Sequence, residues 1–400
     1  MLSVTEAETQ VLAAVAVLPA EDCAIEEAQG RVLRQPLVAD RDVPPFDRVV
    51  MDGYALRCDL WEAGTRRFRV AGVQAAGAVP MVLPGPDACI EVMTGAVLPW
   101  GADVVVPYEA VTRENAFIQI SPESRISPGQ AIHKSGSDRR SGAVVVRPGI
   151  RLGGREIAVA AAFGYAQVQV SRQPGIAVVT TGDELVDVGS TVAPHQIRRS
   201  NDLALRAALV AAGHSRVGRF HVRDVLREVQ HQLWHIVAEN DVVVITGGVS
   251  KGKLDFVPRV LEELGVAKVF QGVNQRPGRP FWFGLSPRHT PVFALPGNPA
   301  SSYVCLHRYA LPALAKMAGL TSPEPQFAVL ADAVRLESEQ TIFLPVETAD
   351  TPRGERLARP APLNTSGDLA GLTGTAGFVE LPAGGRGFPV GTPVRFWPWI

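Results

Sequence analysis

Three glycine-containing segments in the second half of the sequence carry the residue types of an anion-binding site. They read TTGDEL, TGGVSKGKLD and LPGNPASS, at residues 180–185, 246–255 and 295–302. Each combines glycine, which lets backbone N–H groups approach a ligand, with a carboxylate or a hydroxyl. Such loops bind phosphate, above all where a helix begins directly after the loop. Each segment taken alone is equally typical of a short connecting turn.

A fourth segment, PPFDRVVMDGYALR at residues 44–57, places Asp52 directly before Gly53. Asp-Gly is a common turn dipeptide, because glycine takes positive φ freely and aspartate bonds its own backbone. A turn also presents its side chains on a rigid frame. We therefore expect Asp52 to shape a turn, to hold a ligand, or to do both.

Two basic segments offer cationic groups for an oxyanion. RPGRP places Arg276 and Arg279 on a stiff loop, and guanidinium groups suit phosphates and oxyanions. A solvated basic turn is an equally good interpretation of that segment by itself. In HKSGSDRRSG, Asp138 precedes Arg139 and Arg140, which by itself predicts a tight turn with an ion pair.

Two other segments resemble known motifs, a P-loop and a zinc-binding histidine pair, but each lacks a required residue. Residues 247–253 fit the G-x-x-x-x-G-K of a P-loop, but Leu254 stands where a Ser or Thr would bind Mg²⁺. His231 and His235 are spaced like zinc ligands on a helix, but Gln232 replaces the glutamate of H-E-x-x-H. We predict no true P-loop and a surface histidine pair.

The elements that must position these residues are predicted by the hydrophobic pattern. From about residue 174 buried strands alternate with amphipathic helices, including a helix from Ser200, one capped by Asp224 and a long one over residues 300–319. This alternation predicts a parallel sheet covered on both faces. In such sheets ligands bind outside the carboxyl ends of the strands, where all three glycine segments would meet.

The whole chain sets the class of protein. Its 400 residues predict several domains, and its net charge of −1 gives no field for nucleic acid or an acidic membrane surface. Four scattered cysteines without a C-x-x-C spacing favour reduced thiols in the cytoplasm. No apolar run predicts a membrane span. Ser3 and Glu6 form a capping box that opens a first helix, and residues 1–40 hold two short helical patterns.

Seven motifs, in order, resemble those of the molybdopterin molybdenumtransferases, the family of MoeA and the E domain of gephyrin. They are PPFDRVVMDGYA, VMTGAVLPWGADVVV, TTGDEL, SND, TGGVSKGKLDF, RPGRPFWFG and LPGNPASS. The likeness spans essentially the whole chain. It implies a multidomain α/β plus β protein with a central doubly wound parallel sheet, β-rich flanking domains and a small C-terminal β-barrel. The expected divisions are 1–42 with 141–172 (helical or linker), 43–140 (β-rich, inserted), 173–321 (α/β, molybdopterin-binding) and 322–400 (barrel).

The resemblance also implies the reaction. Family members take adenylated molybdopterin and molybdate, insert the metal into the dithiolene and release AMP. A pyrophosphate substrate calls for backbone donors, cationic side chains and Mg²⁺. The family is expected to form a homodimer whose site lies across the interface, and a molybdopterin adenylyltransferase is the expected partner.

Carried over position by position, the family's functional residues fall on this sequence as follows. The catalytic set is Asp52, Thr94, Asp138, Glu184, Asp224 and Asp255. The set that binds the pterin nucleotide and the oxyanion is Gly247, Gly248, Ser250, Arg276, Arg279, Pro296, Asn298 and Ser366. The expected Mg²⁺ ligands are Asp52, Glu184 and Asp255.

The sequence departs from the family at several of these sites. Arg48-Val49-Val50 replaces Asn-Ser-Ala, both lysines of the basic loop are arginine, and Lys251, Lys253 and Arg198-Arg199 make the rim more basic. An arginine fork does not have the geometry of a lysine point charge. Alternatives to a molybdenum insertase are therefore a tungstate-handling paralogue and a non-catalytic carrier or scaffold.

Overall fold

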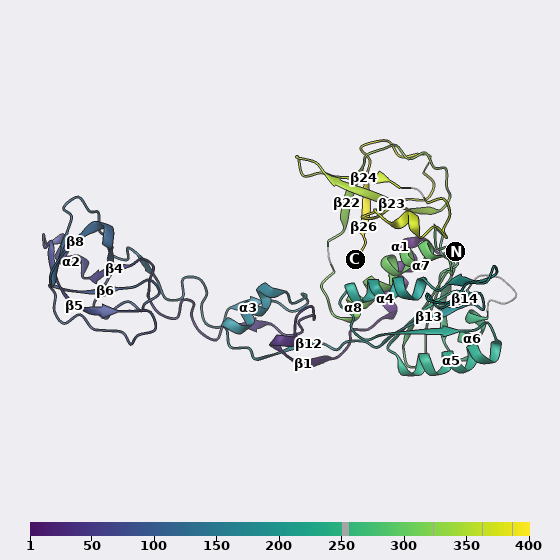
Figure 1. The fold of residues 1–400 in the computed structure, drawn as a ribbon, viewed down its shortest axis with the longest axis horizontal. Helices are drawn as coiled ribbons and strands as arrows, with labels where there is room; N and C mark the ends of the chain where they lie inside the picture. The colour runs from purple at the N-terminus through teal and green to yellow at the C-terminus, as the bar shows by residue number, and fades with distance from the viewer. Residues whose placement is uncertain (250–255, 323, 362, 386) are drawn as a thin grey trace.

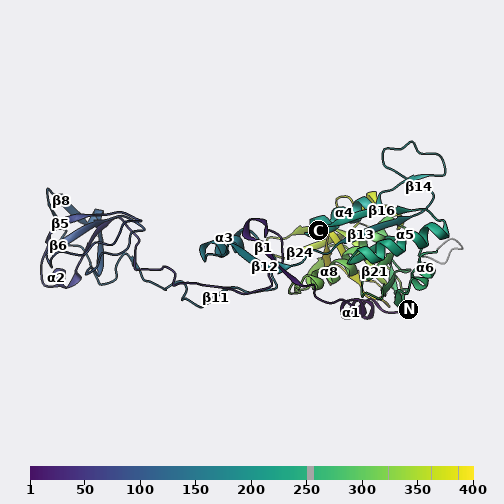
Figure 2. The ribbon, with the colours of Figure 1, turned by 90° about the horizontal axis from the view of Figure 1, so that it is seen from below.

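The computed structural model describes residues 1–249, 256–322, 324–361, 363–385 and 387–400. The molecule is elongated and consists of a β-rich body at one end, a small middle body, and an α/β body with a C-terminal barrel at the other end (Figure 1). The same row of bodies is seen after a quarter turn (Figure 2).

The α/β body contains a six-stranded sheet in the order β16-β13-β17-β21-β20-β18. In that order the strands span Val217–Val222, Ile176–Thr181, Val242–Thr246, Pro291–Leu295, Trp282–Leu285 and Ala267–Gln271. The first four strands are parallel, β20 is antiparallel to β21, and β18 is antiparallel to β20. The expected parallel sheet is confirmed for four strands. The antiparallel edge formed by β20 and β18 was not predicted.

Helices cover both faces of this sheet, as predicted. On β13, Val178 faces a core shared with α1, α4, α7 and α8, whereas Val179 faces a core shared with α5 and α6. This alternation explains why the strand is apolar at nearly every position. The helices span Val4–Ala14 (α1), Asn201–Ala211 (α4), Leu226–Glu239 (α5), Val257–Glu263 (α6), Pro299–Cys305 (α7) and Leu311–Met317 (α8).

The long helix expected over residues 300–319 is interrupted by a π-helical turn, Leu306–Ala310, between α7 and α8. Pro312 has no N–H for the carbonyl of Arg308 four residues earlier. A widened turn before the proline accommodates this missing bond. Asp224 is not the N-cap residue of α5 as predicted, because the N-cap position is Val225, whose side chain makes no capping hydrogen bond.

The C-terminal region forms a closed five-stranded barrel, as expected. The barrel strands follow the order β23-β24-β22-β26-β25, and β25 pairs again with β23. They span Thr341–Asp350, Arg356–Pro360, Gln326–Leu330, Pro393–Pro398 and Gly377–Leu381. A two-residue strand from the α/β body, β19 (Gln275–Arg276), adds to β23 in parallel.

A buried arginine fastens the barrel to the α/β body. Arg308, in the π-helical turn, is fully buried and lies 2.9 Å from Glu8 of α1 and 3.1 Å from Glu380 of β25. Trp397 Nε1 donates to the same Glu380 carboxylate at 3.0 Å. One cation therefore joins the first helix, the α/β body and the barrel.

The β-rich body is built on a second six-stranded sheet, in the order β7-β4-β6-β5-β9-β8. Its strands span Val104–Pro107, Gly53–Leu56, Ala88–Val92, Arg67–Gln74, Phe117–Ile120 and Val111–Glu114, with α2 at Cys58–Glu62. Beside this sheet, the short strand β3 (Arg48–Val49) pairs with β10 (Ile132–His133).

The middle body combines the two chain segments that flank the β-rich body. β1 (Ala20–Ala24) pairs with β12 (Gln167–Ser171), and β2 (Leu37–Val38) pairs with β11 (Val144–Val146). The only described helices here are α3 (Gly154–Ala162) and the 3-10 turn Ile25–Glu27. The expectation of two helical patterns in residues 1–40 is therefore wrong in part, since β1 and β2 are strands.

The first helix begins as predicted but belongs to another body. Ser3 and Glu6 form the expected capping box, with the Ser3 N–H donating to Glu6 Oε2 at 2.8 Å. Val4, Ala7 and Val11 of α1 pack into the core of the α/β body. We therefore propose the domain division given above, with α1 assigned to the α/β domain.

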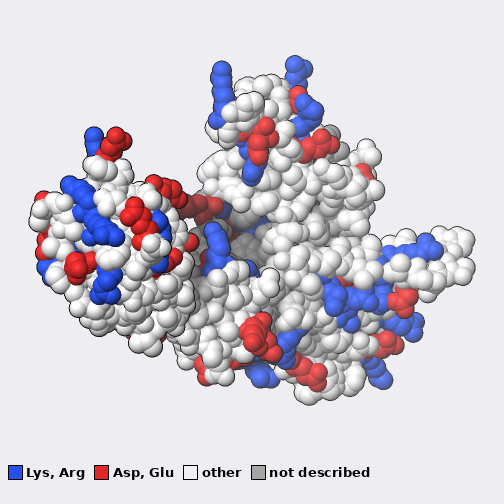
Figure 3. All heavy atoms as spheres, turned by 60° about the vertical axis from the view of Figure 1, so that its left-hand side comes forward, with Lys and Arg blue, Asp and Glu red and all other residues white. Residues whose placement is uncertain are grey.

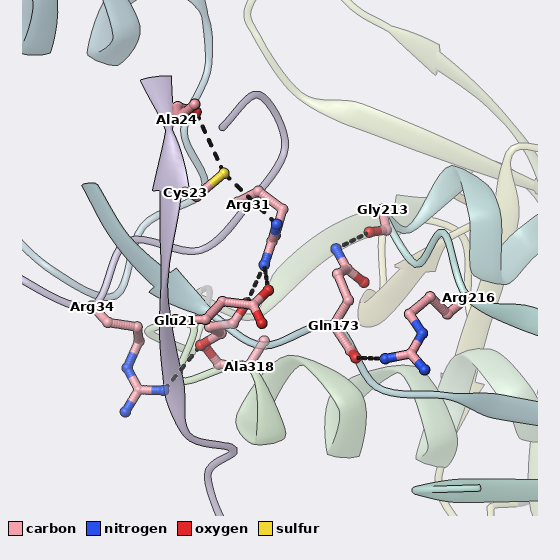
Figure 4. A network of polar contacts seen from close by, with 10 residues as sticks. Glu21, Cys23, Ala24, Arg31, Arg34, Gln173, Gly213, Arg216 and Ala318 are labelled. Carbon is pink, nitrogen blue, oxygen red and sulfur yellow. Dashed lines mark hydrogen bonds and ion pairs between the residues drawn. The ribbon is translucent and has the colours of Figure 1, made fainter. Parts of the chain in front are cut away.

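A polar network joins the middle body to the α/β body (Figure 4). The Arg31 guanidinium binds the Glu21 carboxylate and donates to the Ser171 carbonyl at 2.8 Å, and the Ser171 hydroxyl donates to the Ala318 carbonyl. Next to them, Gln173 Nε2 donates to the Gly213 carbonyl at 3.0 Å. These bonds anchor the chain where it leaves β12.

All four cysteines are unpaired and buried. Among the described residues, no helix has the length and apolar character that crossing a membrane requires.

Candidate functional site

The carboxyl ends of five strands meet at one edge of the α/β sheet. The four parallel strands end there, and β18 ends there too, because it is antiparallel to β20, which is itself antiparallel to β21. The segments leaving these ends begin at Gly182, Arg223, Gly247, Gly272 and Pro296. The three glycine segments and the basic loop therefore leave the sheet at the same side, which we call the carboxyl edge. This is where open α/β sheets bind ligands.

The loop after β17 packs so closely on Thr181 that only glycine fits. A Cβ on Gly247 would lie 2.7 Å from the Thr181 carbonyl oxygen, and one on Gly248 would lie 2.9 Å from Thr181 Oγ1. Both glycines have positive φ, 98° and 63°. Thr181 Oγ1 is buried and has no hydrogen-bond partner among the described residues. A buried hydroxyl without a partner favours a polar ligand or water beside it.

A network of hydrogen bonds fixes the neighbouring loop after β21. Asn201 Nδ2 donates to Thr246 Oγ1 at 3.1 Å and to the Gly297 carbonyl at 2.8 Å. Thr246 Oγ1 donates in turn to the carbonyl of Pro296 at 2.9 Å. These bonds fix Pro296, a predicted site residue, next to the loop after β17. The two loops are close at this point, since a Cβ on Gly297 would lie 3.4 Å from Gly247 Cα.

The barrel contributes Ser366 to the carboxyl edge. Asn298 Nδ2 donates to Ser366 Oγ at 2.6 Å, and the Ala300 N–H donates to the Ser366 carbonyl at 3.2 Å. Two residues predicted from distant parts of the sequence are thus in contact. The barrel also takes one of the first N–H groups of α7, and the Gly247 N–H already donates to the Leu295 carbonyl at 3.3 Å. The anion-binding capacity of this edge therefore rests mainly on its guanidinium groups.

The basic loop is held from behind by a buried contact. Gly278 has φ 96°, and a Cβ there would lie 2.5 Å from both Cys305 Sγ and Gln275 Nε2. Gln275 is buried and donates to Cys305 Sγ at 3.4 Å. Arg276 and Arg279 are exposed on either side of this anchored glycine. The loop therefore presents two guanidinium groups from a fixed backbone.

Two acids after β13, Asp183 and Glu184, make different contacts. Asp183 Oδ1 accepts from Arg223 Nε and from the Asp224 N–H, both at 3.3 Å, so it joins the two loops. Glu184 is exposed and folds back over Gly182, where a Cβ would lie 2.7 Å from Glu184 Oε1. The structure thus brings Glu184 and Asp224, two predicted site residues, to the same edge.

Asp52 and Thr94 are in direct contact in the β-rich body. The Thr94 N–H donates to Asp52 Oδ1 at 2.7 Å, and Thr94 Oγ1 donates to the same oxygen at 2.8 Å. These two bonds lower the pKa of Asp52 below its ordinary value. Gly53 is required by its neighbour strand β7 rather than by positive φ, because a Cβ would lie 2.2 Å from the Val106 carbonyl oxygen.

The expected ion pair between Asp138 and the adjacent arginines is not made. The Asp138 carboxylate instead lies 3.0 Å from His133 Nε2. Arg139 donates to the backbone carbonyl of Asp138 at 2.6 Å, and Arg140 binds Asp42 at 3.0 Å. The sequence prediction failed because it considered only neighbours in the chain, whereas the turn at residues 134–137 brings His133 to Asp138.

The predicted residues form two groups that lie on separate bodies of one chain. Asp52, Thr94 and Asp138 belong to the β-rich body, and Glu184, Asp224 and the glycine and arginine loops belong to the α/β body at the other end (Figure 1). Ser250 and Asp255, like Lys251 and Lys253, lie outside the described residues.

The remaining expectations concern the histidine pair and the surface charge. His231 and His235 are exposed on α5 with ring centroids 4.8 Å apart, as predicted for a surface pair. The described residues include no cluster of three or more His, Cys, Asp or Glu that could hold a metal ion. Acidic and basic side chains are interspersed on the face drawn in Figure 3, in line with the net charge of −1.

Sequence reasoning did not single out four residues that organise the site. Thr181 and Gln275 are buried polar side chains at strand ends, which is a recognisable signal next to glycine. Asn201 appeared only within a motif. His133 gave no local signal, because its partners Asp138 and Arg48 are brought to it by a turn and a strand pair.

Three family profiles match successive parts of the chain. "MoeA N-terminal region (domain I and II)" matches residues 2–164, "Probable molybdopterin binding domain" residues 177–316, and "MoeA C-terminal region (domain IV)" residues 328–399.

Full-length relatives and solved structures agree with these profiles. The chain is 38% identical over 377 residues to a molybdopterin molybdenumtransferase of a Synechocystis species, with 94% of each chain covered. It is 32% identical over 397 residues to the protein of that name in Bacillus subtilis, covering 94% of this chain and 91% of that protein. A crystal structure of a molybdopterin biosynthesis MoeA protein from Pyrococcus horikoshii aligns with a TM-score of 0.85 at 32% identity, over 100% of this chain and 99% of the other.

Proposed function

The chain belongs to the MoeA family of molybdopterin molybdenumtransferases, and from this membership we propose that it inserts molybdenum from molybdate into adenylated molybdopterin and releases AMP. It is accordingly a transferase of molybdenum cofactor biosynthesis. We propose that the glycine and arginine loops at the carboxyl edge bind and orient the substrates.

The structural observation that supports this proposal is the cradle made by Thr181, Gly247 and Gly248. The two glycines are pressed against Thr181, and its buried hydroxyl is unpartnered among the described residues. The Thr181 hydroxyl is a donor that a phosphate or pterin oxygen can accept, whereas the Gly247 N–H already donates to the Leu295 carbonyl at 3.3 Å. We assign the pterin nucleotide to this cradle, together with Pro296 and Asn298 of the loop after β21.

The exposed guanidinium groups of Arg276 and Arg279 are proposed to bind an oxyanion. Guanidinium forks bind tetrahedral oxyanions and phosphates in a bidentate manner. Their loop is fixed by Gly278 and leaves the sheet at the same edge as the cradle. Ser366 Oγ, held by Asn298, adds a hydroxyl to this side of the site.

The acids of the β-rich body lie on a different body from the cradle. We propose that a second copy of the chain supplies them, so that Asp52, Thr94 and Asp138 of one subunit face Glu184 and Asp255 of the other. Such a site would make Asp52→Ala and Glu184→Ala inactive alone but complementary when mixed. Activity that does not return in mixtures after subunit exchange would contradict the shared site.

Mg²⁺ fits the proposed donor set, because it prefers oxygen ligands and usually takes one or two carboxylates plus substrate phosphates. Glu184 and Asp255 of one subunit and Asp52 of the other would hold it. The low pKa of Asp52 keeps that carboxylate ionised. When bound, the ion would offset the charge of the pyrophosphate.

The remaining parts of the proposal concern the cell. We propose a cytoplasmic enzyme that receives its nucleotide from a molybdopterin adenylyltransferase. Two alternatives remain open: tungstate as the substrate, and a carrier role without catalysis. They rest on the arginines that replace lysine in the basic loop and on Arg48-Val49-Val50 beside Asp52.

The test is AMP release from adenylated molybdopterin with Mg²⁺ and with molybdate, tungstate or neither, beside Asp52→Ala. Release that depends on molybdate and is abolished in Asp52→Ala supports the insertase. Faster release with tungstate would change the assigned oxyanion. Tight nucleotide binding without release under any condition would reject the catalytic proposal and leave a carrier.

A further inference from the structure

We propose that His133 and Arg48 are positioning residues that hold the Asp138 carboxylate in one orientation, so that Arg48, His133 and Asp138 act as one unit. The inference rests on the proposed function, in which Asp138 faces the substrates. It goes beyond that function in assigning roles to a histidine and an arginine that the family resemblance does not supply.

The three side chains form a continuous chain of hydrogen bonds. Arg48 Nη2 lies 3.0 Å from His133 Nδ1, and His133 Nε2 lies 3.0 Å from Asp138 Oδ1. A guanidinium has only donors, so His133 Nδ1 must accept and therefore carries no proton. The imidazole proton is then on Nε2 and is donated to Asp138. The Asp138 carboxylate only accepts, so Arg48 and Asp138 favour the same tautomer from opposite sides of the ring.

The backbone holds the three residues in this order. Arg48 and His133 are directly opposite each other in the β3–β10 pair, where cross-strand side chains are neighbours. The Asp138 N–H donates to the Val43 carbonyl at 2.9 Å, just after the turn at residues 134–137. The unit therefore depends on tertiary pairing and not on flexible surface contacts alone.

Asp138 differs from three other acids of the same region, Asp42, Asp47 and Asp52, because its carboxylate accepts no backbone N–H among the described residues. Asp42 accepts the Ser141 N–H at 2.8 Å, and Asp47 accepts the Ser135 N–H at 2.9 Å, so both carboxylates hold turns. Within the part of the chain that the structure describes, the Asp138 carboxylate has a hydrogen bond or ion pair with His133 alone.

The Asp138 side chain is also half exposed, at 51%. Its second oxygen, Oδ2, has no hydrogen-bond partner among the described residues and is available to a ligand. This arrangement leaves one oxygen of an exposed carboxylate open to a ligand.

The same strand connects this unit to Asp52. The Val49 N–H donates to the Ala96 carbonyl at 2.9 Å, and the Gly95 N–H donates to the Val49 carbonyl at 2.8 Å. β3 therefore lies between the turn that carries Thr94, the partner of Asp52, and β10, which carries His133. Arg48 replaces a small polar residue of the family at the point where one strand supports both acids.

The test is a double-mutant cycle on AMP release in the full-length protein. His133→Leu keeps the volume but removes both bonds, so kcat is expected to fall by about 10-fold, as for loss of a hydrogen bond to a charged group, with little change in KM. His133→Gln, whose amide can accept from Arg48 and donate to Asp138, is expected to restore most of kcat. In an Asp138→Ala background, His133→Leu is expected to cause no further loss.

The matched control is Arg140→Ala, which removes an ion pair to Asp42 in the same region without touching Asp138. It is expected to leave kcat and KM unchanged. Additive losses for His133→Leu and Asp138→Ala, or a His133→Leu enzyme as active as wild type, would overturn the positioning role.

A measurement independent of activity keeps this inference separate from the proposed function. The ring nitrogens of His133, assigned by NMR against His133→Gln, are expected to show a proton on Nε2 and none on Nδ1. That preference is expected to weaken in Arg48→Ala and to be lost in the Arg48→Ala/Asp138→Ala double variant. A proton on Nδ1 in the wild type would refute the unit. If the wild type shows the expected tautomer but releases no AMP, the proposed function fails and the positioning role in that reaction fails with it. Wild-type AMP release with additive His133 and Asp138 losses would overturn only the inference.

Discussion

Replacing Glu380 by glutamine is expected to loosen the barrel from the α/β body. The change removes one of the two carboxylates that neutralise Arg308, a guanidinium with no exposed surface. Glutamine retains an oxygen that can accept the hydrogen bond of Trp397 Nε1. The variant therefore tests the charge rather than the shape of this contact.

The expected loss follows from the burial of the pair. Breaking a buried ion pair by removing one partner costs about 3–5 kcal/mol, because the remaining charge is left uncompensated. Glu380 is 16% exposed and Glu8 still faces Arg308, so the lower end of that range applies, at about 3 kcal/mol.

The assay is urea unfolding of the full-length protein, monitored by tryptophan fluorescence. Trp397 and Trp399 of the C-terminal segment contribute to this signal. The matched control is Arg356→Gln, which breaks a barrel ion pair whose side chains are 40% and 67% exposed. That loss should stay below about 1 kcal/mol, as for surface pairs. If Glu380→Gln costs no more than the control, Arg308 does not fasten the barrel as we describe.

Three further predictions concern the site and the pH dependence of stability. Thr94→Val removes a hydroxyl bond to Asp52 but keeps the backbone N–H bond, so the pKa of Asp52 should rise and the acid limb of the AMP-release profile should move to higher pH; an unmoved limb would contradict the contact. Burial lowers the pKa of His307 to about 4, whereas the same side chain in the unfolded chain takes up a proton near pH 6.5. As the pH falls from about 6.5 to about 4, the free energy of unfolding should therefore decrease by about 3 kcal/mol. The urea midpoints at pH 7 and 4.5 should differ less in His307→Gln than in wild type. Gly278→Ala places a Cβ 2.5 Å from Cys305 Sγ and should weaken nucleotide or oxyanion binding in calorimetry through displacement of the basic loop, whereas unchanged binding would show that this loop is not in the site.

The sequence was sufficient to predict the elements whose hydrophobic pattern or capping residues directly reflect their burial or their ends. Ile176–Thr181 is apolar at almost every position because both of its faces are covered, and it forms the predicted strand. The glycine segments follow such strands directly, so their meeting at one edge could be predicted from topology alone. Ser3 and Glu6 opened a helix as predicted because a capping box involves only neighbours in the chain.

The failures occurred where distant partners determine the structure. β18 buries only Phe270 of its five residues, so it lacks the apolar run of an interior strand and was missed. The position of α1 on the α/β body depends on Val4 and Val11 finding a distant core. Asp138 was paired with its neighbours in the sequence, whereas its partner His133 is set by a turn and by the β3–β10 register.

The most direct test of the central claim is the ratio of molybdenum to AMP in a single turnover. The purified protein, loaded with adenylated molybdopterin and Mg²⁺, is mixed with molybdate, and AMP is measured alongside the molybdenum that stays with the pterin. A molybdenum insertase should give one molybdenum bound per AMP released, and neither product without molybdate. AMP release without bound molybdenum, or binding of the nucleotide with no release, would contradict the account.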